Sequence, residues 1–169
     1  PPLISVVVPV YNTPEHWLRR MIESVREQIY PHWELCIADD ASPESHVRKV
    51  LEELTAADPR IKAAYRTEHG HISAASNSAI ELATGEFMAL HNHDDELPVN
   101  ALYWIAEEII AHPEVDVIFS DEDKVDPQGN RLAPYFMPDF NYDLLLSQNC
   151  ISHLGAYRLT KVREVEGFH

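Results

Sequence analysis

The sequence predicts an α/β fold with a mostly parallel central sheet flanked by helices. Three observations predict it. Short apolar runs rich in β-branched residues alternate with segments of helical periodicity, which is typical of right-handed βαβ units. The first run is dense in valine and isoleucine on both faces, as expected of a strand buried on both sides. Polar and acidic residues directly follow several of the runs.

The alternation is clearest in the first half of the chain. Residues 3–10 predict a strand, after which Thr13 is expected to be the N-cap of a helix with Pro14 at its first position. Apolar residues then repeat at helical spacing through residue 29. Further strands are expected at 33–38, 61–65 and 86–90, and further helices from Ser42 and Pro43 to Asp58 and over 71–83.

The second half follows the same alternation up to residue 124 and then loosens. We expect a helix over 99–111 and a strand over 115–119. Beyond these lie a turn at 127–130, an irregular stretch, a short helix at 143–147 and a strand-like run at 155–159. The whole chain is therefore interpreted as one domain, 1–169.

Composition and charge limit the function classes. The chain has 169 residues, of which 45% are hydrophobic and 24% charged, which is enough for one full core. Its net charge of −15 argues against a nucleic-acid surface, which needs a basic stripe. A nucleotide diphosphate is still compatible with this charge, because a bound metal reverses the local sign. No apolar run approaches the roughly 18–20 residues that span a bilayer.

The cysteines and the two ends of the chain bear on its setting. Cys36 and Cys150 form no metal-binding spacing, and Cys36 lies inside an apolar strand, which favours a reduced, cytoplasmic compartment. The chain begins with Pro1 and ends with residues typical of mid-sequence, so we interpret it as a piece of a longer protein. Association with the inner face of the cytoplasmic membrane is expected only through parts outside this chain.

Polar groups follow four of the predicted strands. Asp94 and Asp95 come after the run 87–90, and such a pair before a helix often serves only as a cap or dipole partner. Because the carboxyl ends of parallel strands share one edge, where ligands bind, we expect the polar groups to converge there. Oxygen ligands of this kind favour Mg²⁺, Mn²⁺ or Ca²⁺. The groups are Tyr11 and Asn12, Asp39 and Asp40, Asn92, Asp94 and Asp95, and Asp121 and Asp123.

Five ordered blocks resemble one known family. They look like the nucleotide-sugar domain of the inverting family 2 glycosyltransferases, which have the GT-A fold. The resemblance is nearest to bacterial enzymes that build O-antigen and related surface polysaccharides, including rhamnosyltransferase-like members. The match covers essentially the whole chain. The blocks lie at 5–13, 33–42, 72–79, 89–97 and 120–123.

The resemblance implies roles in binding a nucleotide diphosphate sugar donor. The edge of the first strand packs against the base and ribose. Asp40, with Asp39 beside it, accepts a hydrogen bond from the base, as a carboxylate can from a uracil or thymine imide N–H. Ala75 and Asn77 lie near the phosphates and the sugar. The implied donor-binding residues are Pro9, Val10, Tyr11, Asn12, Asp39, Asp40, Arg66, Asn77, Asn92, His93 and Asp94.

The resemblance also implies a metal and an acceptor side. Asp94 and Asp95 match the metal-binding end of the family's aspartate motif, so a divalent cation, Mn²⁺ or Mg²⁺, would offset charge on the departing nucleoside diphosphate. Asp121 and Asp123 are implied to face the acceptor, a glycan or a lipid-linked saccharide. The chain then divides into a nucleotide-binding part, 1–97, and an acceptor-side part, 98–169.

Three departures from the family pattern stand out. The first position of the aspartate motif is Asn92, whose neutral amide should weaken metal binding. The block normally written Asn-Gly-Gly is changed within residues 68–71 (Glu-His-Gly-His), which alters the lining on the sugar side. The general base of an inverting transfer is expected beyond His169, because neither Glu164 nor Glu166 fits its position. We therefore expect this piece to bind donor without completing catalysis.

Two alternatives are left open by the sequence. The neutral residue in the aspartate motif and the missing base are compatible with a degenerate domain that binds nucleotide or glycan without turnover. The run His91-Asn-His93-Asp-Asp95 resembles the start of zinc-dependent hydrolases, although Glu96 stands where a further histidine would be. For the GT-A site, and not for the hydrolase, His153 is considered as a third metal ligand.

Overall fold

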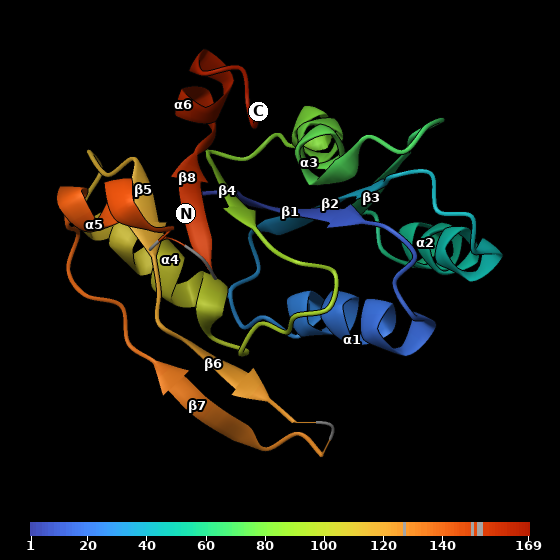
Figure 1. The fold of residues 1–169 in the computed structure, drawn as a ribbon, viewed down its shortest axis with the longest axis horizontal. Helices are drawn as coiled ribbons and strands as arrows, with labels where there is room; N and C mark the ends of the chain where they lie inside the picture. The colour runs from blue at the N-terminus through green and yellow to red at the C-terminus, as the bar shows by residue number, and fades with distance from the viewer. Residues whose placement is uncertain (127, 150, 152–153) are drawn as a thin grey trace.

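The computed structural model describes residues 1–126, 128–149, 151 and 154–169. Its centre is a six-stranded sheet in the order β3-β2-β1-β4-β8-β5, with a separate two-stranded hairpin, β6–β7 (Figure 1). The strands are β1 Ile4–Val10, β2 Trp33–Asp39, β3 Ile61–Tyr65, β4 Phe87–Leu90, β5 Val117–Phe119, β6 Glu122–Val125, β7 Arg131–Tyr135 and β8 Gly155–Arg158. The helices are α1 Glu15–Arg26, α2 Ser45–Ala57, α3 His71–Leu82, α4 Ala101–Ala111, α5 Tyr142–Ser147 and α6 Leu159–Glu164.

The sheet is mostly parallel, as predicted. β1 pairs in parallel with β2 on one side and β4 on the other, and β2 pairs in parallel with β3. β8 is antiparallel to both β4 and β5, so β5 runs in the same direction as β4. Val10 lies opposite Asp39 at the end of β1 and β2, and Val7 lies opposite Leu90. The residues that follow β1, β2, β4 and β5 therefore leave the sheet at one common edge.

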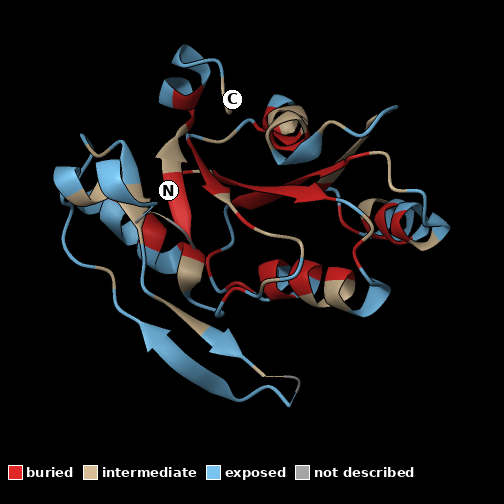
Figure 2. Cartoon of the chain, viewed as in Figure 1, coloured by how far each residue is buried: buried red, intermediate tan, exposed pale blue. Residues whose placement is uncertain are grey.

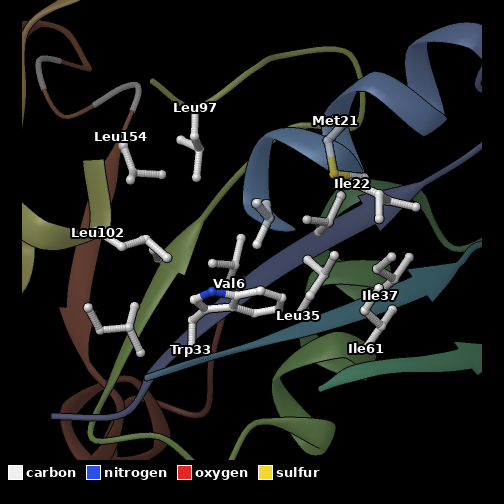
Figure 3. Close-up of a cluster of buried hydrophobic side chains, with 14 of the residues drawn as sticks. Val6, Met21, Ile22, Trp33, Leu35, Ile37, Ile61, Leu97, Leu102 and Leu154 are labelled. Atoms are coloured by element: carbon white, nitrogen blue, oxygen red, sulfur yellow. The ribbon is translucent and has the colours of Figure 1, made fainter. Parts of the chain in front are cut away.

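Helices cover both faces of the sheet. The larger apolar cluster joins one face to α1, α2 and α4, and the smaller cluster joins the other face to α3 and α6. Figure 3 shows part of the larger cluster, with Leu35 and Ile37 from β2 facing Met21 and Ile22 of α1. Every residue of β1 and β2 is buried, which explains why their sequences have no polar face.

Three helices, α1, α2 and α4, begin later than predicted. Pro14, not Thr13, lies at the N-cap of α1, Thr13 is buried, and no side-chain hydrogen bond caps that end of the helix. α2 begins at Ser45 with Glu44 at its N-cap, because the Ser42 hydroxyl accepts a hydrogen bond from the Asn12 backbone N–H instead of capping the helix. The other limits differ by a few residues: α1 ends at Arg26, α4 begins at Ala101 and β5 begins at Val117.

The region after residue 124 is more regular than predicted. Residues 131–135, part of which fall in the stretch expected to be irregular, form β7, and the β6–β7 hairpin lies away from the sheet and exposes most of its described residues (Figure 2). The short helix α5 and the strand β8 lie where the sequence predicts them, and α6 was not predicted. Among the described residues, no helix has the length and apolar content needed to cross a membrane.

Candidate functional site

The carboxyl edge of the sheet is tied together by its backbone. Asp40, the first residue after β2, donates its N–H to the Val10 carbonyl at 2.8 Å, and Arg66, the first after β3, donates its N–H to the Asp39 carbonyl at 2.9 Å. Three neighbouring strands therefore end in a fixed register. Asp40 and Arg66 leave the sheet side by side with the end of β1.

Asp40 is a buried carboxylate surrounded by donors. Its side chain is 2% exposed and forms an ion pair with Arg66, whose Nε lies 2.7 Å from Oδ1, and Nδ1 of His69 lies 2.8 Å from Oδ2. The Gly70 N–H lies 3.0 and 3.1 Å from the two carboxylate oxygens. Burying a charge is costly unless it is paired and hydrogen-bonded, and here every side of the carboxylate meets a donor.

Arg66 connects the carboxylate of Asp40 to helix α3. The Nη1 of Arg66 donates to the Ala74 carbonyl at 3.2 Å and to the Ser78 hydroxyl at 2.7 Å. A Cβ at Gly70 would lie 2.6 Å from Nη2 of Arg66 and 2.9 Å from the Cβ of Ala74, so only glycine lets the loop approach this closely. The guanidinium is thus held in one position between Asp40 and the helix.

Two aromatic rings lie beside Asp40. Tyr11, the residue after β1, is 40% exposed, and its ring stacks on the His69 imidazole with centroids 4.1 Å apart and an interplanar angle of 29°. His71 meets the His69 ring edge-on at 4.5 Å and has a φ of +63°, which is uncommon for a residue with a Cβ. The departure at residues 68–71 therefore puts His69 against Tyr11 and Asp40.

Asn12 and Asp39 form hydrogen bonds with the loop between β2 and α2. Asn12 has a φ of +50°, a left-handed conformation that asparagine tolerates well. Its N–H donates to the Ser42 hydroxyl at 2.9 Å, and its side-chain oxygen accepts from the Glu44 N–H at 3.3 Å. Asp39 accepts from the Ser42 N–H at 3.1 Å. These two predicted donor-binding residues shape the loop between β2 and α2.

The loop after β4 passes along the end of β1. The His91 N–H donates to the Val7 carbonyl at 3.0 Å, and the His93 Nδ1 lies 3.3 Å from the Pro9 carbonyl. Asn92 donates from Nδ2 to Oδ2 of Asp95 at 2.9 Å. Asp94 is exposed. The aspartate motif therefore lies on one side of β1, and Asp40 lies on the other.

The aspartate motif fits a divalent cation of a particular kind. Asp94 and Asp95 offer carboxylate oxygens, and ions such as Mg²⁺ are usually bound by one or two carboxylates, with phosphates and waters completing the shell. Within the described part of the chain, no group of three or more His, Cys, Asp or Glu side chains could hold a metal ion. Asp94 and Asp95 would therefore hold such an ion only together with ligands other than the described protein side chains.

Other predicted residues have different surroundings. Asn77 donates from Nδ2 to the Phe168 carbonyl and accepts from the Phe168 N–H, both at 2.9 Å, so its side chain is directed to the C-terminal segment. Asp121 accepts from the Met137 N–H at 2.7 Å, and Asp123 pairs with Arg131 across the β6–β7 hairpin. His153 lies outside the described residues. The structure thus brings together the ends of β1, β2 and β4, and it leaves Asn77, Asp121 and Asp123 in other contacts.

Two hollows lie away from this edge. One, of about 300 Å³, is formed by the β6–β7 hairpin around Asp123 and Tyr135. The other, of about 380 Å³, lies between α3 and α6 and is lined by Asn77, Arg163 and Gly167. Asp123, which the resemblance implies on the acceptor side, lines the first hollow together with its neighbour Glu122.

Similar proteins of known sequence are much longer than this chain. The protein y4gI of Sinorhizobium fredii (strain NBRC 101917 / NGR234) is 51% identical over 167 residues, which are 99% of this chain and 18% of that protein. The O-antigen biosynthesis protein RfbC of Myxococcus xanthus is 35% identical over 98% of this chain and 13% of that protein. The chain spans less than a fifth of either relative.

Solved structures share the fold. S. aureus TarS 1-349 in complex with UDP-GlcNAc matches with a TM-score of 0.78 and 22% identity, over 98% of this chain and 48% of that chain. The mannosyltransferase PcManGT from Pyrobaculum calidifontis, in complex with GDP-Man and Mn²⁺, matches with a TM-score of 0.73 and 22% identity, over 99% of this chain and 48% of that chain. The fold of this chain is the GT-A fold of these glycosyltransferases.

The family of this chain is assigned from a sequence match over nearly its full length. The sequence model of the family described as "Glycosyl transferase family 2" matches residues 5–165. This match includes all five sequence blocks, and it favours a transferase over the zinc-dependent hydrolase considered from His91 and His93. The chain belongs to glycosyl transferase family 2.

Proposed function

We propose that the protein transfers a sugar, with inversion, from a nucleoside diphosphate sugar to a saccharide or lipid-linked acceptor in the synthesis of a cell-surface polysaccharide. The observation that carries the proposal is the buried Asp40 beside the exposed ring of Tyr11, at the carboxyl edge of a parallel sheet. Ligands of open α/β sheets bind at this edge. The family and the name of the Myxococcus xanthus relative support the polysaccharide role.

The proposed base site lies around Tyr11 and Asp40. An exposed aromatic ring offers a face for stacking, and a fixed carboxylate offers an acceptor in the plane of a stacked base. Uracil, thymine and guanine carry a ring N–H that this acceptor can bind, whereas adenine and cytosine carry none. Pro9 and Val10 complete the edge that would contact the base and ribose. Arg66 already donates from Nε to Asp40 and from Nη1 to α3, so Nη2 is the group that would reach a phosphate.

The proposed diphosphate site lies at the aspartate motif. Asp94 and Asp95 would hold a divalent cation, Mn²⁺ or Mg²⁺, with Asn92 and His93 beside the sugar nucleotide. A bound cation would supply charge stabilisation for the departing nucleoside diphosphate. The exposed carboxylate of Asp94 is the freer of the two acids, since Asp95 already accepts a hydrogen bond from Asn92.

The acceptor is proposed to approach from the part formed by residues 98–169. Asp121 and Asp123 lie at the start of the hairpin, and this hairpin presents exposed aromatic residues such as Tyr135. The general base stays a prediction, a carboxylate that follows Phe168 in the whole protein. The same proposal puts donor binding in the cytoplasm, at the inner face of the membrane.

A second candidate function is binding of nucleotide or glycan without turnover. The contact between Asn92 and Asp95 favours it, because a neutral amide stands in the aspartate motif and already engages one of the two acids. In this case the base site would be kept and the cation site would be lost. Nucleotide affinity would then be the same with and without metal.

Calorimetry separates these functions. UDP, GDP and dTDP are each titrated into the chain with and without Mn²⁺, with ADP as a base that lacks a ring N–H. The transferase proposal expects Mn²⁺-dependent binding of at least one of the first three and weaker binding of ADP. The variant Asp94→Asn should lose the metal dependence, and the matched control Glu114→Gln, at an exposed site after α4, should keep it. Metal-independent binding supports the non-catalytic function, and no nucleotide binding at all contradicts the transferase and the nucleotide-binding form of the second candidate.

A further inference from the structure

The imidazole of His69 makes the contacts that the proposed function assigns to the nucleobase of the donor. Its ring lies 4.1 Å from the Tyr11 ring in a stacked arrangement, and its Nδ1 lies 2.8 Å from Oδ2 of Asp40. Because a carboxylate oxygen only accepts, Nδ1 carries the shared proton. A flat ring stacked on Tyr11, with an N–H directed at Asp40, makes the two contacts that the proposed function assigns to the base of the donor.

The carboxylate of Asp40 has no room for a further donor. A carboxylate offers about four lone-pair sites. Oδ1 accepts from Arg66 Nε and the Gly70 N–H, and Oδ2 accepts from the Gly70 N–H and from His69 Nδ1. A base N–H can therefore bind Asp40 only if one of these donors leaves.

Of the three donors, His69 is the one that can leave by a side-chain rotation. Arg66 is held by Ala74 and Ser78 on α3, and Gly70 donates from its backbone at the start of the same helix. The His69 side chain is 38% exposed and lies in an exposed loop, where it contacts Asp40, Tyr11 and the edge of His71. Rotation of its side chain would uncover the Tyr11 face and free one oxygen of Asp40.

We propose that His69 is an internal competitor for the nucleobase site, and that donor binding requires its displacement. The inference rests on the proposed function and deepens it by naming a residue that regulates the same site. The apparent affinity of a ligand is reduced by the fraction of the protein in which the site is open. If His69 covers the site in about nine molecules of ten, its removal should tighten binding of a nucleotide about tenfold.

The test compares UDP with pyrophosphate by calorimetry in the presence of Mn²⁺. His69→Ala should bind UDP about tenfold more tightly than the unchanged chain, and pyrophosphate, which has no base, should bind both equally. The matched control is His112→Ala, which removes an exposed imidazole at the end of α4 and should bind UDP as the unchanged chain does. Circular dichroism establishes that each variant is folded.

The outcomes separate the inference from the proposed function. If His69→Ala binds UDP with equal or lower affinity while the unchanged chain binds it, the competitor role is wrong and the nucleotide site stands. If neither chain binds UDP, GDP or dTDP, the nucleotide site itself is wrong, and the role of His69 falls with it. A gain in affinity for pyrophosphate as large as that for UDP also contradicts the inference, since the effect would not depend on the base.

A second measurement follows the unchanged chain itself, and a variant serves only to identify the signal. In the unchanged chain, the histidine Hε1 and Cε1 signals are followed by NMR during titration with UDP. The His69 signal, identified by its absence in His69→Ala, should move as the imidazole leaves the ring current of Tyr11, and pyrophosphate should leave it in place. A His69 signal that UDP saturates without moving overturns the proposal.

Discussion

Arg66 donates from Nε to Oδ1 of Asp40 across 2.7 Å, and the same guanidinium donates from Nη1 to the carbonyl of Ala74 on α3. Asp40 is buried and Arg66 is partly buried, so this pair links the end of β2 to the helix that covers it. The charge of Asp40 is tolerated because of these contacts. The pair therefore supports the fold and also sets the position of the carboxylate proposed to read the base.

Removal of Arg66 should destabilise the protein. Arg66→Ala leaves the buried carboxylate of Asp40 with one ion-pair partner fewer and is expected to lower the free energy of unfolding by about 3 kcal/mol. Arg66→Lys should recover part of the loss, since it keeps the charge but not the fork of donors. Urea denaturation measures both. Lys161→Ala, which breaks the exposed pair with Glu164, is the control and should change stability by less than about 0.5 kcal/mol.

A second buried carboxylate makes stability depend on pH. Burial raises the pKa of Glu34, but hydrogen bonds from Lys62, Ser5 and Thr84 outweigh it and hold the pKa below its ordinary value. With the folded pKa below the unfolded one, this group contributes stability that is fully present above about pH 4.3 and is lost as the pH falls through the folded pKa. The unfolding free energy should therefore fall in acid.

Glu34→Gln isolates that contribution. At pH 7 the variant should be less stable by about 2 kcal/mol, because hydrogen bonds to a charged group are replaced by weaker ones. The difference from the unchanged chain should shrink as the pH falls below about 4.3. Urea titrations at several pH values measure it. If the difference in unfolding free energy between the two chains stays constant through the acid range, the contacts do not stabilise the charged form of Glu34.

The sequence was most informative where a single physical requirement, such as burial of both faces of a strand, determined the residues. β1 and β2 could be predicted because both faces of each strand are buried, and Asp40 and Asp94 could be placed at one edge because parallel strands end together. The hairpin β6–β7 could not, because its strands are exposed and are joined by contacts such as that between Asp123 and Arg131. Periodicity carries no signal for such strands.

Contacts between side chains that are far apart in the sequence could not be predicted either. The change at residues 68–71 was visible in the sequence, but its meaning depends on the packing of His69 against Tyr11, which no spacing reveals. Asn77 was expected at the donor, and its amide instead meets the backbone of Phe168. The signal that could have found this contact is the small-residue face of α3, which lets another segment approach closely.

The contact between Asn77 and Phe168 should hold the C-terminal segment in place. Asn77→Ala removes both hydrogen bonds and should raise the hydrogen-exchange rate of the Phe168 amide, with a loss of about 1–2 kcal/mol in its protection. Asn77→Asp keeps the acceptor for the Phe168 N–H and loses the donor to its carbonyl, so its effect should be smaller. Equal exchange in all three chains would show that other contacts fix this segment.

Cys36 should be inert to thiol reagents in the folded protein. Burial in the smaller apolar cluster raises the pKa of its thiol to about 12, and the thiolate is the reactive form. In a Cys150→Ser background, an Ellman-type disulfide reagent at pH 8 should therefore label no thiol before denaturation and one thiol per chain after it. Rapid labelling of the native chain would contradict the burial of this strand.

Asn92 is expected to limit the affinity of the proposed cation site. Asn92→Asp adds a charged oxygen ligand beside Asp95 and should tighten Mn²⁺-dependent UDP binding about tenfold, because the affinity of such sites rises with the number of charged ligands. Asp94→Asn should have the opposite effect. Calorimetry with and without Mn²⁺ measures both. The matched control is Asn100→Asp, at the exposed N-cap of α4, which adds the same charge without touching the motif. If Asn92→Asp and Asn100→Asp change the affinity alike, the gain comes from net charge, and Asn92 does not lie at a cation site.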